Sequence, residues 1–193
     1  MLFNSVEFIL FFIIVYTLYL VLNHKWQNLM LLVASYIFYG SWDWRFLSLI
    51  LISTIMDYYL GLKIFHSTEQ KKRKQYLCVS LFCNLGFLGF FKYYNFFIDN
   101  AKQLFSLFGM SANIPSLEII LPVGISFYTF QSLSYTIDIY YKHLNAEKNF
   151  LNFALFVSFF PQLVAGPIER ATHLLPQVTK PRTITKNDIK EGL

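Results

Sequence analysis

Polar side chains recur at helical spacing inside one apolar segment of this chain, residues 121–141. At about 100° of rotation per residue, they occupy one narrow arc of a helix. The arc holds Gly124, Gln131, Tyr135 and Asp138, with Tyr128 and Ser134 at its edges. Such a face either lines a polar path that binds a substrate or forms hydrogen bonds to neighbouring helices. The segment is the first candidate site under either interpretation.

Two carboxylates interrupt otherwise apolar segments. An ionisable group at bilayer depth costs at least about 2.5 kcal/mol, so Asp57 and Asp138 each need hydrogen-bonding partners or a water-filled cavity. Asp57 shares its helix face with Ser53, Thr54 and Gly61. That stripe of small and polar residues favours close helix packing over a binding site at Asp57.

Familiar catalytic and metal-binding patterns are missing from the sequence. It contains no GxSxG, Walker A or HExxH motif and no Cys/His cluster with metal-ligand spacing. Cys78 and Cys83 are five residues apart, which is the spacing of neither a redox pair nor a zinc half-site. The four histidines all lie outside the apolar segments: His24, His66, His143 and His173. Residue types alone therefore assign neither a catalytic base nor a metal.

Composition places these polar residues in a membrane protein. Of 193 residues, 55% are hydrophobic, 20% aromatic and only 14% charged, and the apolar residues gather in blocks rather than in alternating patterns. The predicted fold is all-α, a polytopic transmembrane helical bundle occupying residues 1–168. Its six apolar segments are 8–22, 28–39, 46–65, 76–91, 121–141 and 150–164.

Not every segment is predicted to cross the bilayer. Segment 28–39 is short for a hydrocarbon core of about 30 Å, and segment 150–164 breaks at Pro161, so each either spans or re-enters. The mixed stretch 95–116 is expected along the interface. Residues 169–193 form a polar tail in which Thr185 opens a further helix. Because Leu193 follows so soon after that start, we expect the chain to be an N-terminal fragment.

The formal net charge of +5 follows from topology rather than from nucleic-acid binding, because the basic residues lie between apolar segments and no recognition module accompanies them. If all six segments cross, eight basic residues share one side: Lys25, Lys63, Lys71, Lys72, Arg73, Lys74, Lys142 and Lys148. The other side, through residue 102, holds Arg45, Lys92 and Lys102. The positive-inside rule predicts a multi-pass plasma (inner) membrane protein with its N-terminus outside.

Several strings carry a family resemblance over essentially the whole chain. They are MLFNS at 1–5, SYIFY at 35–39, GFFKYYNFF at 89–97, LPVGISFYTFQ at 121–131 and SFFPQLVAGPI at 158–168, followed by KNDIKEGL at 186–193. In order and approximate spacing, the chain resembles the membrane-bound O-acyltransferase family, and in particular its alginate O-acetylase branch.

The resemblance implies an enzyme that passes an acyl group, usually acetyl, to a hydroxyl of an exported or cell-surface polysaccharide. It implies an acetyl donor, either acetyl-CoA or a thioester on a partner, together with partner proteins of a glycan acetylation system, the lipid bilayer around it and no nucleic acid. The candidate lining residues of the substrate path are Tyr128, Gln131, Tyr135, Asp138, Gln162 and Arg170.

The catalytic histidine of the family belongs to a Trp-His-Gly-like segment that this sequence does not contain, and we expect that segment beyond Leu193. No catalytic residue is therefore assigned within residues 1–193. Transfer to a hydroxyl needs a group that takes its proton, so we expect the chain alone to be inactive. Two rival interpretations remain: a transporter or channel component, and a non-catalytic membrane assembly subunit.

Overall fold

The computed structural model describes residues 5–108, 124–166 and 169–182, and within these ranges it contains helices and no strand. The helix start predicted at Thr185, the chain end at Leu193 and parts of the predicted segments 95–116 and 121–141 lie outside the described residues. The helical elements are α1 (Val6–Val21), α2 (His24–Gly40), α3 (Trp44–His66), α4 (Gln70–Leu88), the π-helical turn η1 (Gly89–Tyr93), α5 (Tyr94–Leu107), α6 (Ile125–Tyr140), α7 (Phe150–Ser158), α8 (Phe160–Ala165) and α9 (Ala171–Thr179).

Side-chain caps define where four of these helices begin. Ser5, Asn23, Asp43 and Asn149 each accept a hydrogen bond from a backbone N–H in the first turn of α1, α2, α3 and α7, respectively. Asp43 also accepts from the guanidinium of Arg45, with 2.6 Å between Nη2 and Oδ2. That side-chain hydrogen bond lowers the pKa of Asp43 and keeps the cap charged.

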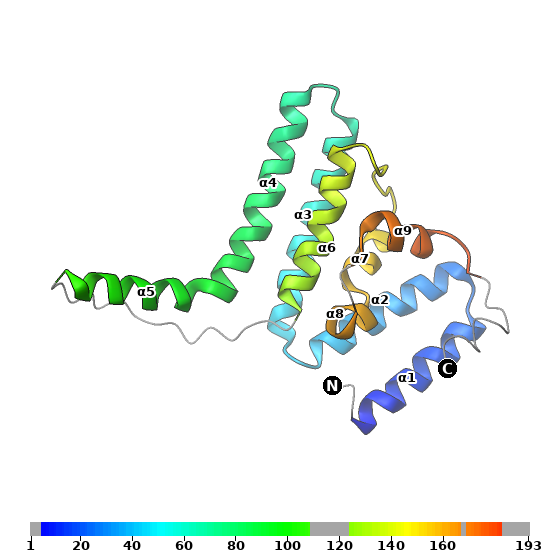
Figure 1. The fold of residues 1–193 in the computed structure, drawn as a ribbon. Coiled ribbons are helices and arrows are strands. Elements are labelled where there is room, and N and C mark those ends of the chain that lie inside the picture. The colour runs from blue at the N-terminus through cyan, green and yellow to red at the C-terminus, as the bar shows by residue number, and fades with distance from the viewer. Residues whose placement is uncertain (1–4, 109–123, 167–168, 183–193) are drawn as a thin grey trace.

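Helices α3, α4 and α6 run side by side and form the centre of the fold (Figure 1). Their shared core continues into α7 and α9 through buried side chains such as Ile50, Tyr135 and Phe153. A second apolar cluster joins α1 and α2 to α7, α8 and α9 around Phe38, Leu155 and Phe160. The α7–α8 break therefore lies between the two clusters.

Two helical stretches have the length and composition to cross a membrane: α3, and the continuous run Gln70–Leu107 that comprises α4, η1 and α5. Helix α1 is apolar but shorter, at 16 residues. The apolar segment 150–164 is not one helix, because Phe159 adopts φ −56° and ψ 108° and separates α7 from α8.

The run Gln70–Leu107 bends at η1, and α5 extends away from the bundle as an arm (Figure 1). A π-helical turn disturbs the regular hydrogen-bond ladder and is a recognised cause of kinks. Lys92 in this turn donates to Ser126 Oγ at 3.1 Å, which links the bend to the first turn of α6. No residue of α5 is buried.

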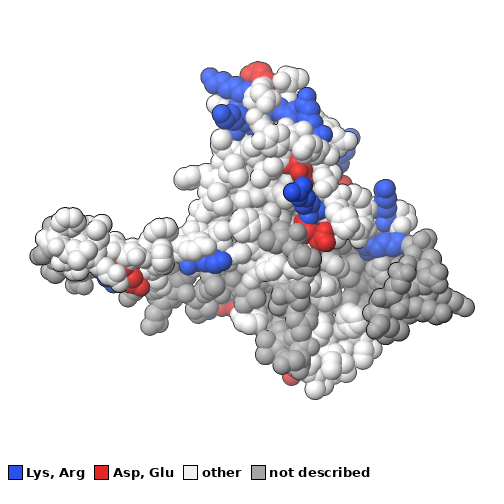
Figure 2. Space-filling model, viewed as in Figure 1, with Lys and Arg blue, Asp and Glu red and all other residues white. Residues whose placement is uncertain are grey.

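Basic side chains gather where α3 meets α4, while the walls of the bundle below are largely uncharged on the face shown in Figure 2. One of these basic side chains, that of Arg73, points into the fold. Arg73 is buried, and its Nη2 donates to the carbonyls of Ile139 and Tyr140 at 3.1 and 2.6 Å. A cation at the C-terminus of α6 satisfies carbonyls that lack helical partners and complements the helix dipole. Arg73 therefore has a structural role besides its place in the basic loop.

The contact between α3 and α6 depends on the absence of a side chain at Gly61. A Cβ built there would lie 2.5 Å from Cε1 of Tyr135. We expect Gly61→Ala to lower the free energy of unfolding by about 1–3 kcal/mol, the usual range for overpacking. Gly86→Ala is the matched control, because nothing lies within 4 Å of its built Cβ. Denaturant titration in detergent, followed by circular dichroism, measures both, and an equal loss in the two variants would contradict the packing argument.

Candidate functional site

The break between α7 and α8 exposes backbone groups that the helices cannot pair internally. Side chains of other helices take their place. Gln131 Nε2 of α6 donates to the Phe156 carbonyl at 2.6 Å, and the Phe160 N–H donates to Ser35 Oγ of α2 at 3.2 Å. Pro161 lies in the first turn of α8, where a missing N–H has no cost. The helix can therefore be interrupted at Phe159, because α2 and α6 supply hydrogen-bond partners for the backbone groups left unpaired there.

Two of the six predicted lining residues, Gln131 and Gln162, meet at this break, and a third lies one helical turn away on α6. Gln131 Nε2 lies 3.4 Å from Gln162 Oε1, and both side chains are buried. Tyr128 is one helical turn before Gln131 on α6 and is 2% exposed. Gly124, with φ +74°, begins α6 close to the Leu163 carbonyl, which lies 3.0 Å from a Cβ built at Gly124. We call Tyr128, Gln131, Gln162 and the α7–α8 break the broken-helix site.

The chemistry available there is hydrogen bonding without a change of charge. Amides and a phenol donate to and accept from neutral oxygens such as a hydroxyl or an ester carbonyl. The Tyr128 hydroxyl is buried and has no hydrogen-bond partner among the described residues.

A histidine is not among the residues of the broken-helix site. The four histidines lie elsewhere, and His24, for example, bonds to the Thr179 carbonyl at 3.2 Å. The broken-helix site therefore offers hydrogen-bonding groups and no imidazole within the described residues, which end at Arg182.

The other three predicted lining residues lie apart from this site. The Tyr135 hydroxyl accepts from the Glu147 N–H at 3.1 Å, and its ring packs on Phe153. Asp138 is near the end of α6, with Oδ1 3.7 Å from Nδ1 of His143. Arg170 is exposed and precedes α9. The polar residues of α6 therefore lie in different surroundings along the helix, because different neighbours pack against each of its turns.

The described part of segment 150–182 enters and returns at one end of the fold. Asn28, in the first turns of α2, donates to Asn152 Oδ1 of α7 at 3.0 Å and to the Val178 carbonyl of α9 at 2.9 Å. Residues 152 and 178 thus lie at the same level, although α7 and α8 lead away from it. The ends of α7 and α9 nearest Asn28 therefore lie close together.

A second polar cluster, centred on Asp57, joins α3, α4 and α6. Asp57 is fully buried; its Oδ1 accepts from Ser80 Oγ at 2.6 Å, and its Oδ2 accepts from Asn84 Nδ2 at 2.7 Å and from Ser132 Oγ. Ser53 Oγ donates to Asn84 Oδ1 at 2.8 Å and completes the cluster.

The sequence indicates a packing role for Asp57 but does not identify its partners. Ser80 and Asn84 are four residues apart in segment 76–91, so one helix face carries both polar groups. That spacing was the available signal. It could not show that the face turns toward Asp57, because the pairing depends on how three helices pack.

Removing the carboxylate should loosen the three-helix centre. We expect Asp57→Ala to lower the free energy of unfolding by about 2 kcal/mol or more, because buried donors lose a charged acceptor. Asp99→Ala on the exposed arm α5 is the control and should change it by less than about 0.5 kcal/mol. The measurement is again denaturant unfolding in detergent, and similar effects in both variants would show that Asp57 does not join the helices.

Comparison with known proteins finds relatives along the whole chain. It is 39% identical over 194 aligned residues to a probable alginate O-acetylase of Pseudomonas putida, covering all of this chain and 40% of that protein. A probable alginate O-acetylase of Pseudomonas aeruginosa is also 39% identical over the whole chain, which covers 37% of it. A peptidoglycan O-acetyltransferase of Helicobacter pylori is 35% identical over 179 residues, covering 80% of this chain and 33% of that protein.

No family model and no solved structure matches the chain. The chain spans about two fifths of the length of the Pseudomonas relatives, at 40% and 37%. Identity of 39% maintained along all of its residues is nevertheless far above chance similarity. Over its whole length the chain is homologous to probable alginate O-acetylases, the group that its sequence resembles.

Proposed function

We propose that this chain is part of a membrane-bound O-acyltransferase that acetylates hydroxyl groups of an exported or cell-surface polysaccharide. The observation that carries the proposal is the match of all of this chain to 40% and 37% of two probable alginate O-acetylases. The match to a peptidoglycan O-acetyltransferase involves a different glycan, so the shared chemistry is transfer to a sugar hydroxyl. An acetyl donor, either acetyl-CoA or a thioester on a partner protein, completes the reaction.

The broken-helix site would contribute to this reaction by orienting neutral oxygens. The Tyr128 hydroxyl has no partner among the described residues and is available to an acceptor hydroxyl or to the carbonyl of the acyl donor. Gln131 holds the break in place through the Phe156 carbonyl. The proton of the acceptor hydroxyl needs a base, which in this proposal is the family's histidine beyond Leu193. The chain alone remains predicted to be inactive.

The topology that we propose has the N-terminus outside and the α3–α4 turn in the cytoplasm, since Lys71–Lys74 form the strongest basic cluster. Helices α1, α2, α3, α4 and α6 then cross, and α7, α8 and α9 form a re-entrant unit that returns to the cytoplasmic side. Helix α5 lies along the outer interface with an apolar face that includes Phe97, Leu104 and Phe105.

Reporter fusions test this topology. Alkaline phosphatase fused after Ser67 should be inactive, and fused after Phe108 it should be active, because the enzyme folds only outside the cytoplasm. A fusion after Arg182 distinguishes the two interpretations of segment 150–164: it is inactive if the segment re-enters and active if the segment spans. Green fluorescent protein at the same positions is the reciprocal control. Phosphatase activity after Ser67 would overturn the orientation.

The proposed activity is tested in a host whose own glycan O-acetyltransferase gene has been deleted. A complete enzyme containing this chain should restore ester-linked acetate on the host polysaccharide, whereas the 193-residue chain alone should not. Tyr128→Phe in the complete enzyme should lower acetylation by roughly tenfold, the loss expected from one hydrogen bond to the reactants.

Tyr59→Phe is the matched control for that variant, since Tyr59 is 59% exposed and removal of its hydroxyl should leave acetylation unchanged. Immunoblotting of membranes confirms equal amounts of each variant. Acetate released by mild alkali measures the product. Full acetylation by Tyr128→Phe would remove the broken-helix site from the mechanism, and no acetylation by the unsubstituted complete enzyme would contradict the proposed function itself.

A further inference from the structure

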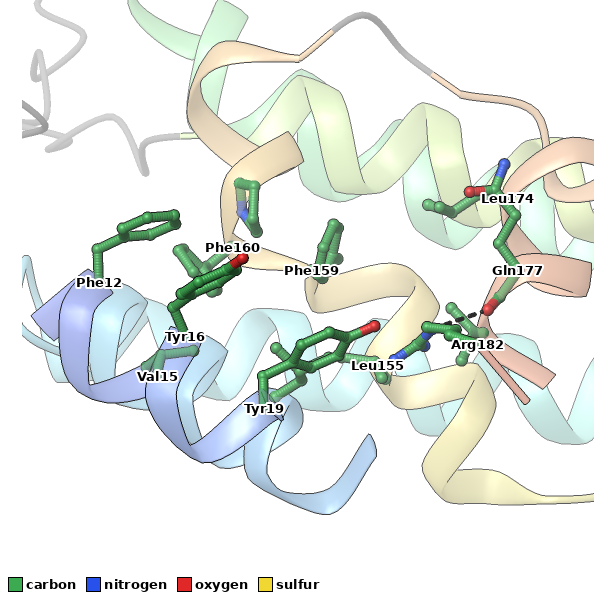
Figure 3. Close-up of a pocket in the computed structure, with 13 residues that line it drawn as sticks. Phe12, Val15, Tyr16, Tyr19, Leu155, Phe159, Phe160, Leu174, Gln177 and Arg182 are labelled. Carbon is green, nitrogen blue, oxygen red and sulfur yellow. Dashed lines mark hydrogen bonds between the residues drawn. The ribbon is translucent and has the colours of Figure 1, made fainter. Parts of the chain in front are cut away.

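An apolar cavity of about 300 Å³ lies between α1 and the re-entrant unit (Figure 3). Its volume is at the lower end of the range for small-molecule sites. Aromatic and aliphatic side chains from α1, α2, α7, α8 and α9 supply most of its wall, including Phe12, Tyr16, Leu155 and Phe160. Phe12 and Tyr16 are 48% and 42% exposed, so the cavity opens sideways between helices rather than toward the centre of the fold.

The positively charged side chain of Arg182 lies at the edge of this cavity. Arg182 Nε donates to the Gln177 carbonyl and Nη2 donates to Asn28 Oδ1, each at 3.0 Å, and the guanidinium lies over the ring of Tyr19. These contacts hold the guanidinium in one orientation. Its remaining nitrogen, Nη1, is buried and has no hydrogen-bond partner in the described part of the chain, and no carboxylate there lies within ion-pair distance of Arg182.

A buried cationic N–H without an acceptor is costly, so this position favours an anionic oxygen. Guanidinium groups bind phosphate oxygens through short, charge-assisted hydrogen bonds. The apolar cavity beside Arg182 offers no partner for the rest of a free phosphate or a sugar, but it does suit a hydrocarbon chain. The unpaired Nη1 of Arg182 and the apolar cavity beside it together fit an amphiphile with an anionic head.

The position of Arg182 relative to the bilayer supports the same ligand. Arg182 bonds to Asn28, two residues after Trp26, which is 57% exposed and follows Lys25. An exposed tryptophan beside a lysine at a helix end is typical of headgroup depth. The cavity continues along α1 from Tyr19 to Phe12, away from this level. A lipid phosphate at Arg182 would thus place its acyl chain alongside Phe12.

We infer that this cavity binds an anionic phospholipid, with the phosphate on Arg182 Nη1 and one acyl chain between α1 and the α7–α8 pair. The cavity borders the α7–α8 break at Phe159, Phe160 and Pro161, whereas Tyr128, Gln131 and Gln162 of the broken-helix site do not line it. The inference rests on charge complementarity at Arg182 and on the apolar lining of the cavity. It does not depend on which glycan is acetylated.

Native mass spectrometry of the 193-residue chain in mild detergent tests the inference, with equal amounts of dioleoyl phosphatidylglycerol and dioleoyl phosphatidylcholine added. The chain should retain phosphatidylglycerol in preference. Arg182→Gln should lower the ratio of the two adducts by roughly tenfold, the change expected when one charge-assisted hydrogen bond is lost. The adduct ratio of Arg182→Lys should lie between those of the unsubstituted chain and Arg182→Gln, because lysine keeps the charge without the fixed guanidinium geometry.

Lys180→Gln is the matched control, since it removes the same charge two residues away on an exposed side chain. It should leave the ratio unchanged. An equal fall in Lys180→Gln and Arg182→Gln, or no fall in either, would overturn the inference. Dihexanoyl phosphatidylglycerol should bind more weakly than the dioleoyl lipid, and equal retention of both would remove the cavity from the site.

Thermal unfolding of the unsubstituted chain keeps the inference testable if Arg182→Gln does not fold. Dioleoyl phosphatidylglycerol should raise the apparent Tm more than dioleoyl phosphatidylcholine does, because a ligand that binds only the folded state stabilises it. Equal shifts with the two lipids would contradict a site that recognises an anionic head.

Discussion

The buried carboxylate of Asp57 is the constraint on which the central helices depend. A carboxylate in an apolar bundle is tolerated only when its oxygens are paired, and the donors come from two other helices, Ser80 and Asn84 of α4 and Ser132 of α6. Apolar contacts alone would allow α3, α4 and α6 to slide or rotate, whereas this set of hydrogen bonds has one satisfactory register. Helix α6 is thereby held in the orientation that presents Gln131 to the α7–α8 break.

The break shows how a polar face of a helix can serve structure and function together. A helix interrupted among apolar side chains leaves backbone groups that water cannot satisfy, so neighbouring side chains must pair with them. Gln131 and Ser35 do so here. The two sequence interpretations of α6, a substrate path and interhelical bonding, are therefore not exclusive. Gln131 contributes to the second, and the Tyr128 hydroxyl, which has no partner among the described residues, is the group to which we assign the first in our proposal.

The helices outside the three-helix centre, namely α1, α2, α7, α8 and α9, are held together differently. Asn28 connects α2 to α7 and to α9 through one hydrogen bond each, and it accepts a third from Arg182 beyond the end of α9. Between this polar junction and the aromatic side chains of α1, an open cavity lies beside the second apolar cluster. Close packing is the rule in protein interiors, so a cavity bordered by exposed aromatic residues points to a molecule outside the chain as the missing part of the packing.

The sequence by itself determined the helical class, the approximate positions of the apolar segments and the family, because hydrophobic blocks and local strings are properties of consecutive residues. It also placed Tyr128, Gln131 and Gln162 among the candidates, and of these Gln131 and Gln162 contact each other at the break. Only the tertiary structure separated Tyr135, Asp138 and Arg170 from them, turned Arg73 inward, and paired Asp57 with Asn84. Helical periodicity specifies which residues share a face, but the partner of each turn depends on helix crossing and on breaks in neighbouring helices, which join residues far apart in the chain.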